Sequence, residues 1–396
     1  MPKTVVLAAA LLVAALVAVE PRVQASLESQ PGAPRAARGL TEGPRLAAVY
    51  DTILQARFDD ARRQLAAACP PAPTPACDAL REVSWWWEIQ QNQWSRALDP
   101  QLEAAAAAAI ASNTAWTARE PGRGESWFYL AASYAPLSQW RVGRGERLAA
   151  ARDGKRIKDS LERALSLDNQ LQDAWFGIGL YHYYADVAPA ALKVLRFLLL
   201  LPGGDRQQGL AEMRRAREGG QLLRGEADYQ MHWLYLWYED QPARARELIR
   251  ALDAQYPSNP LFLQRLADIE HIYFSDHAAS ADAWRVLLER ALAGRVAFAG
   301  VAETRARIGL AAEWIELGTP ARAIEPLLTL IAAQPTAPHG VASLAYATLG
   351  DAYLATQARA RALDAYQRAL DAAPRDDPEQ LRARARAGLS RARGRR

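Results

Sequence analysis

The sequence contains little of what most enzymes and nucleic-acid-binding proteins need. It has 2 cysteines and 5 histidines in 396 residues. The motifs G-x-S-x-G, H-E-x-x-H and G-x-x-x-x-G-K-[ST] do not occur in it. The formal net charge of +4 is too small to indicate a nucleic-acid partner. We therefore expect no enzymatic activity, no cofactor and no nucleic-acid partner.

Long hydrophobic runs are missing after the N-terminus, where residues 1–25 have the pattern of a secretory signal peptide. Lys3 precedes an apolar run over 5–19, and Val23-Gln24-Ala25 provides a small-x-small cleavage site. Because that run is shorter than the roughly 20 residues that span a bilayer, we expect cleavage and an exported, periplasmic or envelope-associated protein. An uncleaved membrane anchor is the alternative. Residues 26–43 are rich in Pro, Gly and Arg and are expected to form a flexible linker.

If the protein is exported, the oxidation state of its two cysteines can be predicted. Cys69 and Cys77 flank a proline-rich turn between two expected helices. In an oxidising compartment such a pair favours a disulfide, and two unreactive thiols are the alternative. Their spacing does not fit a haem or zinc motif, so we predict no metal at this pair.

A repeat pattern is clearest in the stretch from Ser343 to Asp376. Aromatic side chains at Tyr346, Tyr353 and Tyr366 alternate with small residues, of which Gly350 is the smallest. Small residues let a paired helix approach closely, while large ones fill the space between the helices. The 34-residue spacing of these positions is that of the tetratricopeptide repeat.

Similar but divergent patterns cover most of residues 44–377, which we predict to form one α-solenoid. They indicate about eight helical hairpins, since a single hairpin cannot bury its apolar face alone. Two repeats are longer than the pattern allows and imply inserted helical segments, at 137–151 and 187–202. We expect the first to lengthen the second helix of its hairpin, and Asp205 to cap the helix after the second. The Arg-rich residues 378–396 are expected to form a capping helix or tail.

The repeats at 304–337 and 343–376 resemble the tetratricopeptide repeat superfamily. Within it, the segments WFYLAASYA, DAWFGIGLYHYY, LPGGDRQQGL and AQYPSNPLF resemble a group of exported bacterial tetratricopeptide proteins with insertions between repeat helices. The superfamily resemblance implies a right-handed superhelix whose concave groove binds peptides or proteins. The superfamily's Asn/Lys carboxylate clamp is not recognisable in this sequence, so the resemblance does not extend to that mode of recognition.

Groove candidates follow from the helix positions that face the concave surface in this repeat. Aromatic side chains with a polar group suit a protein-binding surface. The alternative is that they pack against the inserted segment 187–201. The predicted binding residues are Phe176, Tyr183, Tyr184, Gln230, Trp237 and Tyr238.

The histidines give weaker signals. His182 takes an aromatic position of its helix, where we expect a hydrogen-bonded, buried or half-buried side chain. Glu270, His271, Asp276 and His277 lie close together in sequence but straddle an expected helix end. We therefore predict no metal site from these four residues.

The sequence as a whole favours a non-enzymatic, exported scaffold. It would bind a protein or peptide in the concave groove, in envelope assembly or transport. Two alternatives remain open. One is a peripheral membrane adaptor held by the N-terminus, the apolar insert or the basic tail. The other is a carrier that encloses a small apolar ligand.

Overall fold

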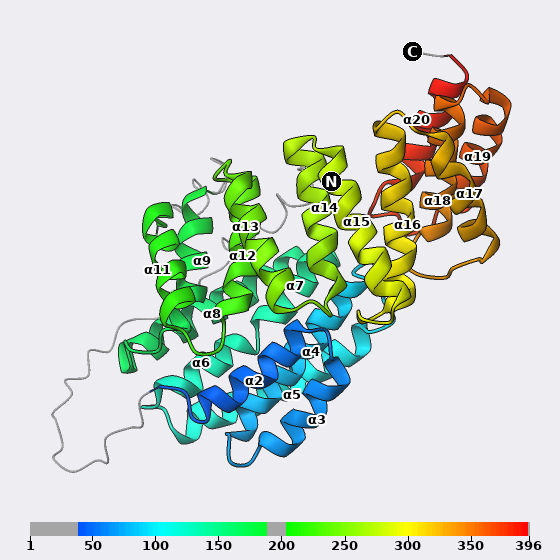
Figure 1. Ribbon diagram of the computed structural model, residues 1–396. Coiled ribbons are helices and arrows are strands. Elements are labelled where there is room, and N and C mark those ends of the chain that lie inside the picture. Colours follow the sequence, from blue (N-terminus) through cyan, green and yellow to red (C-terminus); the bar gives the residue numbers. More distant parts are fainter. Residues whose placement is uncertain (1–38, 188–202, 395–396) are drawn as a thin grey trace, which may run out of the picture. The chain divides into compact units, whose positions relative to one another are not determined.

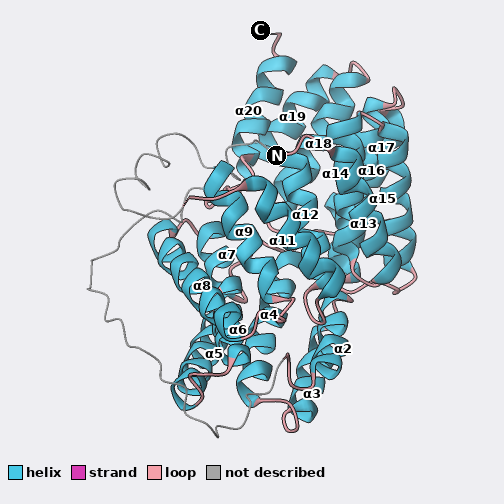
Figure 2. Ribbon diagram, turned by 90° about the vertical axis from the view of Figure 1, so that its left-hand side faces the viewer, coloured by secondary structure: helices cyan, strands magenta, loops and turns pink. Residues whose placement is uncertain are grey.

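The computed structural model describes residues 39–187 and 203–394, and these consist of helices joined by turns and loops. Figure 2 shows no strand among them, which confirms the predicted all-α class. The predicted signal peptide, most of the linker and the insert at 188–202 lie outside the described residues. None of the helices in the two described ranges is both long and apolar enough to cross a membrane.

The chain divides into two compact units, which are interleaved in sequence. Unit 1 takes its described residues from 39–53, 58–86, 99–187 and 203–227. Unit 2 takes its described residues from 54–57, 87–98 and 228–394.

Unit 1 contains the first half of the helices (Figure 1), and from α5 onward they pack on neighbours close in the chain. They are α2 (Gly43–Leu54), α3 (Phe58–Ala68), α4 (Thr74–Gln91), α5 (Asp99–Arg119), α6 (Gly124–Ala132), α7 (Ala135–Gly143), α8 (Arg147–Leu167), α9 (Ala174–Val187) and α11 (Arg206–Gly219). The last residue of α2 and the last five of α4 belong to unit 2. Helix α8 packs on α6, α7 and α9, and α9 packs on α11.

The first insertion differs from the prediction. It was expected to lengthen the second helix of its hairpin. Residues 147–151 do belong to α8, but residues 137–143 belong to a separate helix, α7. Pro136 lies in the first turn of α7, where its missing N–H costs nothing. Gly145, at a φ of +82°, ends the segment before α8 begins. Helix α8 is nevertheless long, at 21 residues.

Three local predictions in unit 1 can be compared with the structure. Cys69 and Cys77 form the expected disulfide, which joins the end of α3 to α4. The Asp205 carboxylate accepts a hydrogen bond from the Gln208 N–H at 2.9 Å and caps α11, as predicted. The described end of the predicted linker is held in place, since the Thr41 N–H donates to Glu125 at 2.7 Å.

Unit 2 is a stack of helical hairpins in chain order, which is the arrangement of an α-solenoid. After α12 (Arg224–Trp237), most of which belongs to it, come α13 (Pro242–Gln255), α14 (Pro260–Phe274), α15 (His277–Leu292), α16 (Ala299–Glu316), α17 (Ala321–Ala332), α18 (Val341–Ala355), α19 (Arg359–Asp371) and α20 (Leu381–Ala392). From α13 onward each helix packs on the next.

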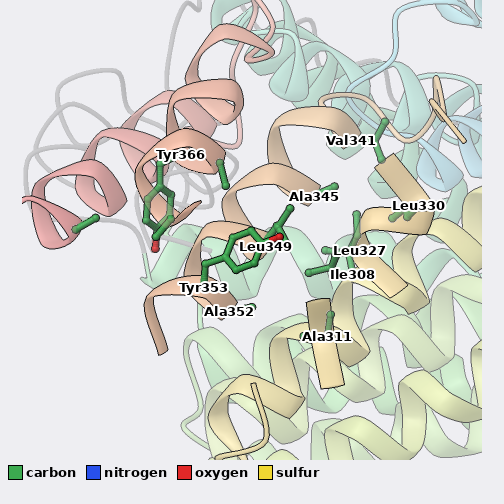
Figure 3. Close-up of a cluster of buried hydrophobic side chains, with 14 of the residues drawn as sticks. Ile308, Ala311, Leu327, Leu330, Val341, Ala345, Leu349, Ala352, Tyr353 and Tyr366 are labelled. Atoms are coloured by element: carbon green, nitrogen blue, oxygen red, sulfur yellow. The ribbon is translucent and has the colours of Figure 1, made fainter. Parts of the chain in front are cut away.

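The core of the last repeats shows why the large and small positions matter. Side chains from α16, α17 and α18 interlock in one cluster, in which Leu327, Leu349 and Tyr353 are buried (Figure 3). The Tyr366 ring of α19 lies between two glycines, so a Cβ on Gly350 would come within 2.7 Å of it and one on Gly388 within 2.2 Å. The large and small residues that define the repeat in the sequence are therefore the residues at which neighbouring helices contact each other.

The Arg-rich end of the chain packs on the last repeat. Helix α20 contacts α19 and α18. The guanidinium groups of Arg384 and Arg391 lie 3.0 Å and 2.8 Å from the carboxylate oxygens of Asp351 on α18. These arginines thus pair with an acidic group of their own unit.

Candidate functional site

The predicted groove residues of unit 1 lie on α9. Phe176 and Tyr183 are buried, while Tyr184 is partly exposed. The Tyr183 backbone lies close to α11, where a Cβ on Gly209 would come within 2.7 Å of the Tyr183 nitrogen. Tyr183 and Phe176 therefore contribute to the packing of α9, and Tyr184 is the one of the three that offers surface.

Asp173, which directly precedes α9, has a structural role. Its carboxylate accepts hydrogen bonds from the backbone N–H groups of Gln221, Leu222 and Leu223 at 2.8–2.9 Å. These bonds give hydrogen-bond partners to the backbone N–H groups just before α12 begins, which have no partner within a helix.

The predicted groove residues of unit 2 lie at or just after the end of α12. Gln230, Trp237 and Tyr238 are all partly exposed. The Trp237 ring stacks on the Trp233 ring one turn earlier, with centroids 4.2 Å apart and planes inclined by 25°. Tyr273 of α14 is also close, since burial raises the pKa of its hydroxyl and the Trp237 side chain opposes this larger effect by lowering it. We call Trp233, Trp237 and Tyr273 the aromatic patch of unit 2.

Charged side chains adjoin this patch. The Arg265 guanidinium of α14 lies 5.0 Å from the Trp233 ring centroid, in a cation–π position, and 3.3 Å from Asp268. Arg305 of α16 is near enough to Arg265 and Asp268 to interact with them electrostatically. Burial lowers the pKa of Arg305, the charge of Glu379 opposes this, and the charge of Arg265 adds to it.

The buried Nε of Arg305 has no hydrogen-bond partner in the described part of the chain. Two arginines, Arg265 and Arg305, thus lie near two carboxylates, Asp268 and Glu379. Guanidinium groups beside partly exposed tryptophans favour a ligand that offers both carboxylates and apolar groups.

The sequence prediction named Trp237 but not the residues around it. Trp233 is spaced four residues from Trp237, which is a visible helical signal. Arg265, Tyr273 and Arg305 come from other repeats, and their position beside α12 depends on how successive hairpins stack.

The histidine predictions have mixed outcomes. His182 is half-buried, and its Nδ1 lies 2.7 Å from Glu212 of α11, as expected. Of the four clustered residues, Glu270 instead pairs with Arg250 at 2.8 Å and with Arg246 at 3.3 Å. The Asp276 carboxylate caps α15 by accepting from the Ala279 N–H.

Comparisons with known proteins show similarity at the level of fold. No protein-family model matches the chain, and no curated protein matches its sequence. Among solved structures it is similar to the APC/C hetero-tetramer Cut9-Hcn1, with a TM-score of 0.42 and 12% identity over 84% of this chain. The chain spans 58% of the length of that structure's chain.

Two further solved structures have the same degree of similarity. Yeast Tom70 has a TM-score of 0.42 and 11% identity, over 88% of this chain and 81% of its own. The human IFIT1 dimer with PPP-AAAA has a TM-score of 0.42 and 12% identity, over 89% of this chain and 86% of its own. The assignment of helical repeats given above rests on the contacts within each unit.

Proposed function

We propose that this chain is an exported, non-enzymatic scaffold that binds an acidic segment of a partner protein on unit 2. The observation that carries the proposal is the aromatic patch of unit 2 with Arg265 and Arg305 beside it. Helical repeats provide rigid, extended surfaces for recognition. The aromatic patch lies on α12 and α14, and the two arginines beside it lie on α14 and α16.

The chemistry of the patch favours a peptide that offers both carboxylates and apolar side chains. Tryptophan and arginine dominate binding energies at protein interfaces because they combine large contact area with a polar or charged group. The partly exposed Trp237 would supply the contact area, and the guanidinium group of the partly exposed Arg305 would supply the charge. Binding should therefore weaken as ionic strength rises.

Two other observations support export. The N-terminal pattern is that of a signal peptide, and the Cys69–Cys77 disulfide belongs to an oxidising compartment. We place the scaffold in envelope assembly or transport on this basis.

A peptide-display selection on the purified mature protein tests the proposal. We expect the selected peptides to be enriched in Asp and Glu and to bind the wild type. The double variant Trp237→Ala/Arg305→Gln should bind them at least tenfold more weakly, since it removes one apolar and one charged contact. Fluorescence anisotropy with labelled peptides measures the change.

The matched control removes the same residue types from unit 1. Arg215 lies 4.4 Å from the Trp175 ring centroid on the surface of that unit. Trp175→Ala/Arg215→Gln should leave the affinity unchanged. Equal affinity of the folded Trp237→Ala/Arg305→Gln variant and the wild type would show that the patch is not the binding site.

A further inference from the structure

Three side chains that could bind a metal meet at one end of the α14–α15 hairpin in unit 2. His271 lies in the last turn of α14, His277 is the first residue of α15, and Glu313 lies on α16. Their ligand atoms all lie within 4.8 Å of one another. The Nδ1 atoms of His271 and His277 each lie 2.9 Å from a Glu313 carboxylate oxygen, Oε1 and Oε2 respectively.

In this cluster the carboxylate is buried and the two imidazoles are partly exposed. The Glu313 side chain is 4% exposed, whereas those of His271 and His277 are 41% and 27% exposed. The Ser280 hydroxyl donates to Glu313 Oε1 at 2.9 Å and fixes the orientation of the carboxylate. Within the described part of the chain, the ion pairs of Glu313 are with these two histidines alone. A buried carboxylate whose charge is paired only by imidazoles is suited to bind a cation, which can enter between the partly exposed histidines.

The turn between α14 and α15 holds the two imidazoles in place. The Asp276 N–H donates to the Glu270 carbonyl at 3.0 Å, and Ser275 takes a left-handed φ of 50° between them. The rings of His271 and His277 are consequently 5.1 Å apart. Because Glu270 pairs with two arginines, its carboxylate is not available as a fourth ligand.

We propose that His271, His277 and Glu313 bind a divalent transition-metal ion of the Zn²⁺ class. Two imidazole nitrogens and one carboxylate oxygen form a recurrent ligand set for zinc, and they leave a fourth position for water on the exposed side. Imidazole ligands favour Zn²⁺ and Co²⁺ over Mg²⁺ and Ca²⁺, which prefer oxygen.

Binding requires little change in the protein. Ligand atoms about 2.1 Å from a tetrahedral ion are about 3.4 Å apart, so the side chains must open slightly from their present hydrogen-bonded distances. Each neutral imidazole would carry its proton on Nε2, and the ion would replace the contacts between Nδ1 and Glu313. The bound ion would tie the α14–α15 turn to α16, and Ser280 would hold the carboxylate from behind.

The test uses the tag-free mature protein after chelator treatment, titrated with ZnCl₂ by calorimetry. We expect one ion per chain, with a dissociation constant in the micromolar range or tighter, and no binding of Mg²⁺ or Ca²⁺. The double variant His271→Ala/His277→Ala and the single variant Glu313→Gln should each bind at least tenfold more weakly. Zn²⁺ should also raise the midpoint of thermal unfolding of the wild type and not of the double variant.

A matched control separates the cluster from general imidazole binding. His339 also belongs to unit 2, where its Nε2 lies 3.0 Å from the Asp376 carbonyl. His339→Ala should bind Zn²⁺ as the wild type does. A folded double variant with wild-type affinity, or a wild type that binds only in the millimolar range, would overturn the proposal.

Cobalt provides a readout that needs no variant, should the substitutions prevent folding. Co²⁺ bound at the cluster should give the intense visible absorption of a four-coordinate site with nitrogen and oxygen ligands. Both cysteines are in a disulfide, so no thiolate band is expected. The weak spectrum of fully hydrated Co²⁺ would overturn the proposal.

Discussion

His232 on α12 is a titratable side chain enclosed by the core of unit 2. It is 0% exposed, its Nδ1 contacts the Tyr229 carbonyl, and its Nε2 has no hydrogen-bond partner in the described residues. Burial lowers its pKa from 6.5 to about 3, and the nearby Arg265 charge acts in the same direction. The folded protein therefore keeps this imidazole neutral at pH values where the unfolded chain binds a proton.

This depressed pKa predicts a loss of stability in acid. As pH falls below 6.5 towards about 3, the unfolded state gains a proton that the folded state does not bind. The contribution of this group to the free energy of unfolding should fall by about 1.4 kcal/mol per pH unit. His232→Phe, which does not titrate, should lack this contribution.

Urea denaturation of both proteins at pH 7.5 and pH 5.0 measures the effect. The wild type should lose about 2 kcal/mol more than His232→Phe between these pH values, since the other groups cancel in the difference. Equal losses would mean that His232 is protonated in the folded state or accessible to water.

Residue-scale predictions from the sequence succeeded where the relevant contact is local or follows the repeat. The partner of His182 lies on the helix paired with its own, and the Cys69–Cys77 bond closes a short turn. The burial of Tyr183, by contrast, depends on how closely α11 approaches α9. The meeting of Glu313 with His271 spans 42 residues and has no signal in the sequence spacing.

At the scale of elements, the crossing of α9 and α11 depends on two glycines that face each other. A Cβ on Gly179 would lie 2.7 Å from the Gly209 carbonyl oxygen and 2.9 Å from the Met213 nitrogen. Both are backbone atoms, so the helices would have to move apart. We expect Gly179→Ala to destabilise the protein by about 1–3 kcal/mol in spite of the higher helix propensity of alanine.

Gly177, on the same helix, is the control. A Cβ there would meet the end of the Leu161 side chain, at 2.5 Å from Cδ1, and a leucine side chain can rotate away. Gly177→Ala should therefore be near neutral or slightly stabilising, because it gains up to about 1 kcal/mol of helix propensity. Chemical denaturation of the two variants and the wild type measures these differences in the free energy of unfolding. If Gly179→Ala is as stable as Gly177→Ala, the backbone contact does not set the crossing of these helices.

The helices themselves were largely predictable, because their signals are local. Helix α5, for example, spans 99–119 and contains an alanine run over 104–109, and alanine is the strongest helix former. The position of the first insertion was predictable, but the separate helix α7 that part of it forms was not. Its length shows in the repeat spacing, whereas the break between α7 and α8 depends on one backbone angle at Gly145.

At the scale of the whole molecule, the disulfide connects fold to compartment. The Cys69–Cys77 bond closes a short loop, and by loop-closure entropy it should stabilise the folded protein by about 2.5 kcal/mol. It persists only where the surroundings are oxidising. The proposed export therefore makes two linked predictions, one about the N-terminus and one about the thiols.

Expression of the full sequence in a bacterial host tests both predictions together. The recovered protein should begin at Ser26 by N-terminal sequencing and should take up no maleimide label. Residues 26–396 expressed in the cytosol should take up two labels, one at each of Cys69 and Cys77. The variant Cys69→Ser/Cys77→Ser should be less stable than the oxidised protein by the loop-closure amount, as measured by denaturation without reductant. An intact Met1, or two free thiols in the protein from the full sequence, would remove the support for export, because an exported chain should lose its signal peptide and keep its disulfide.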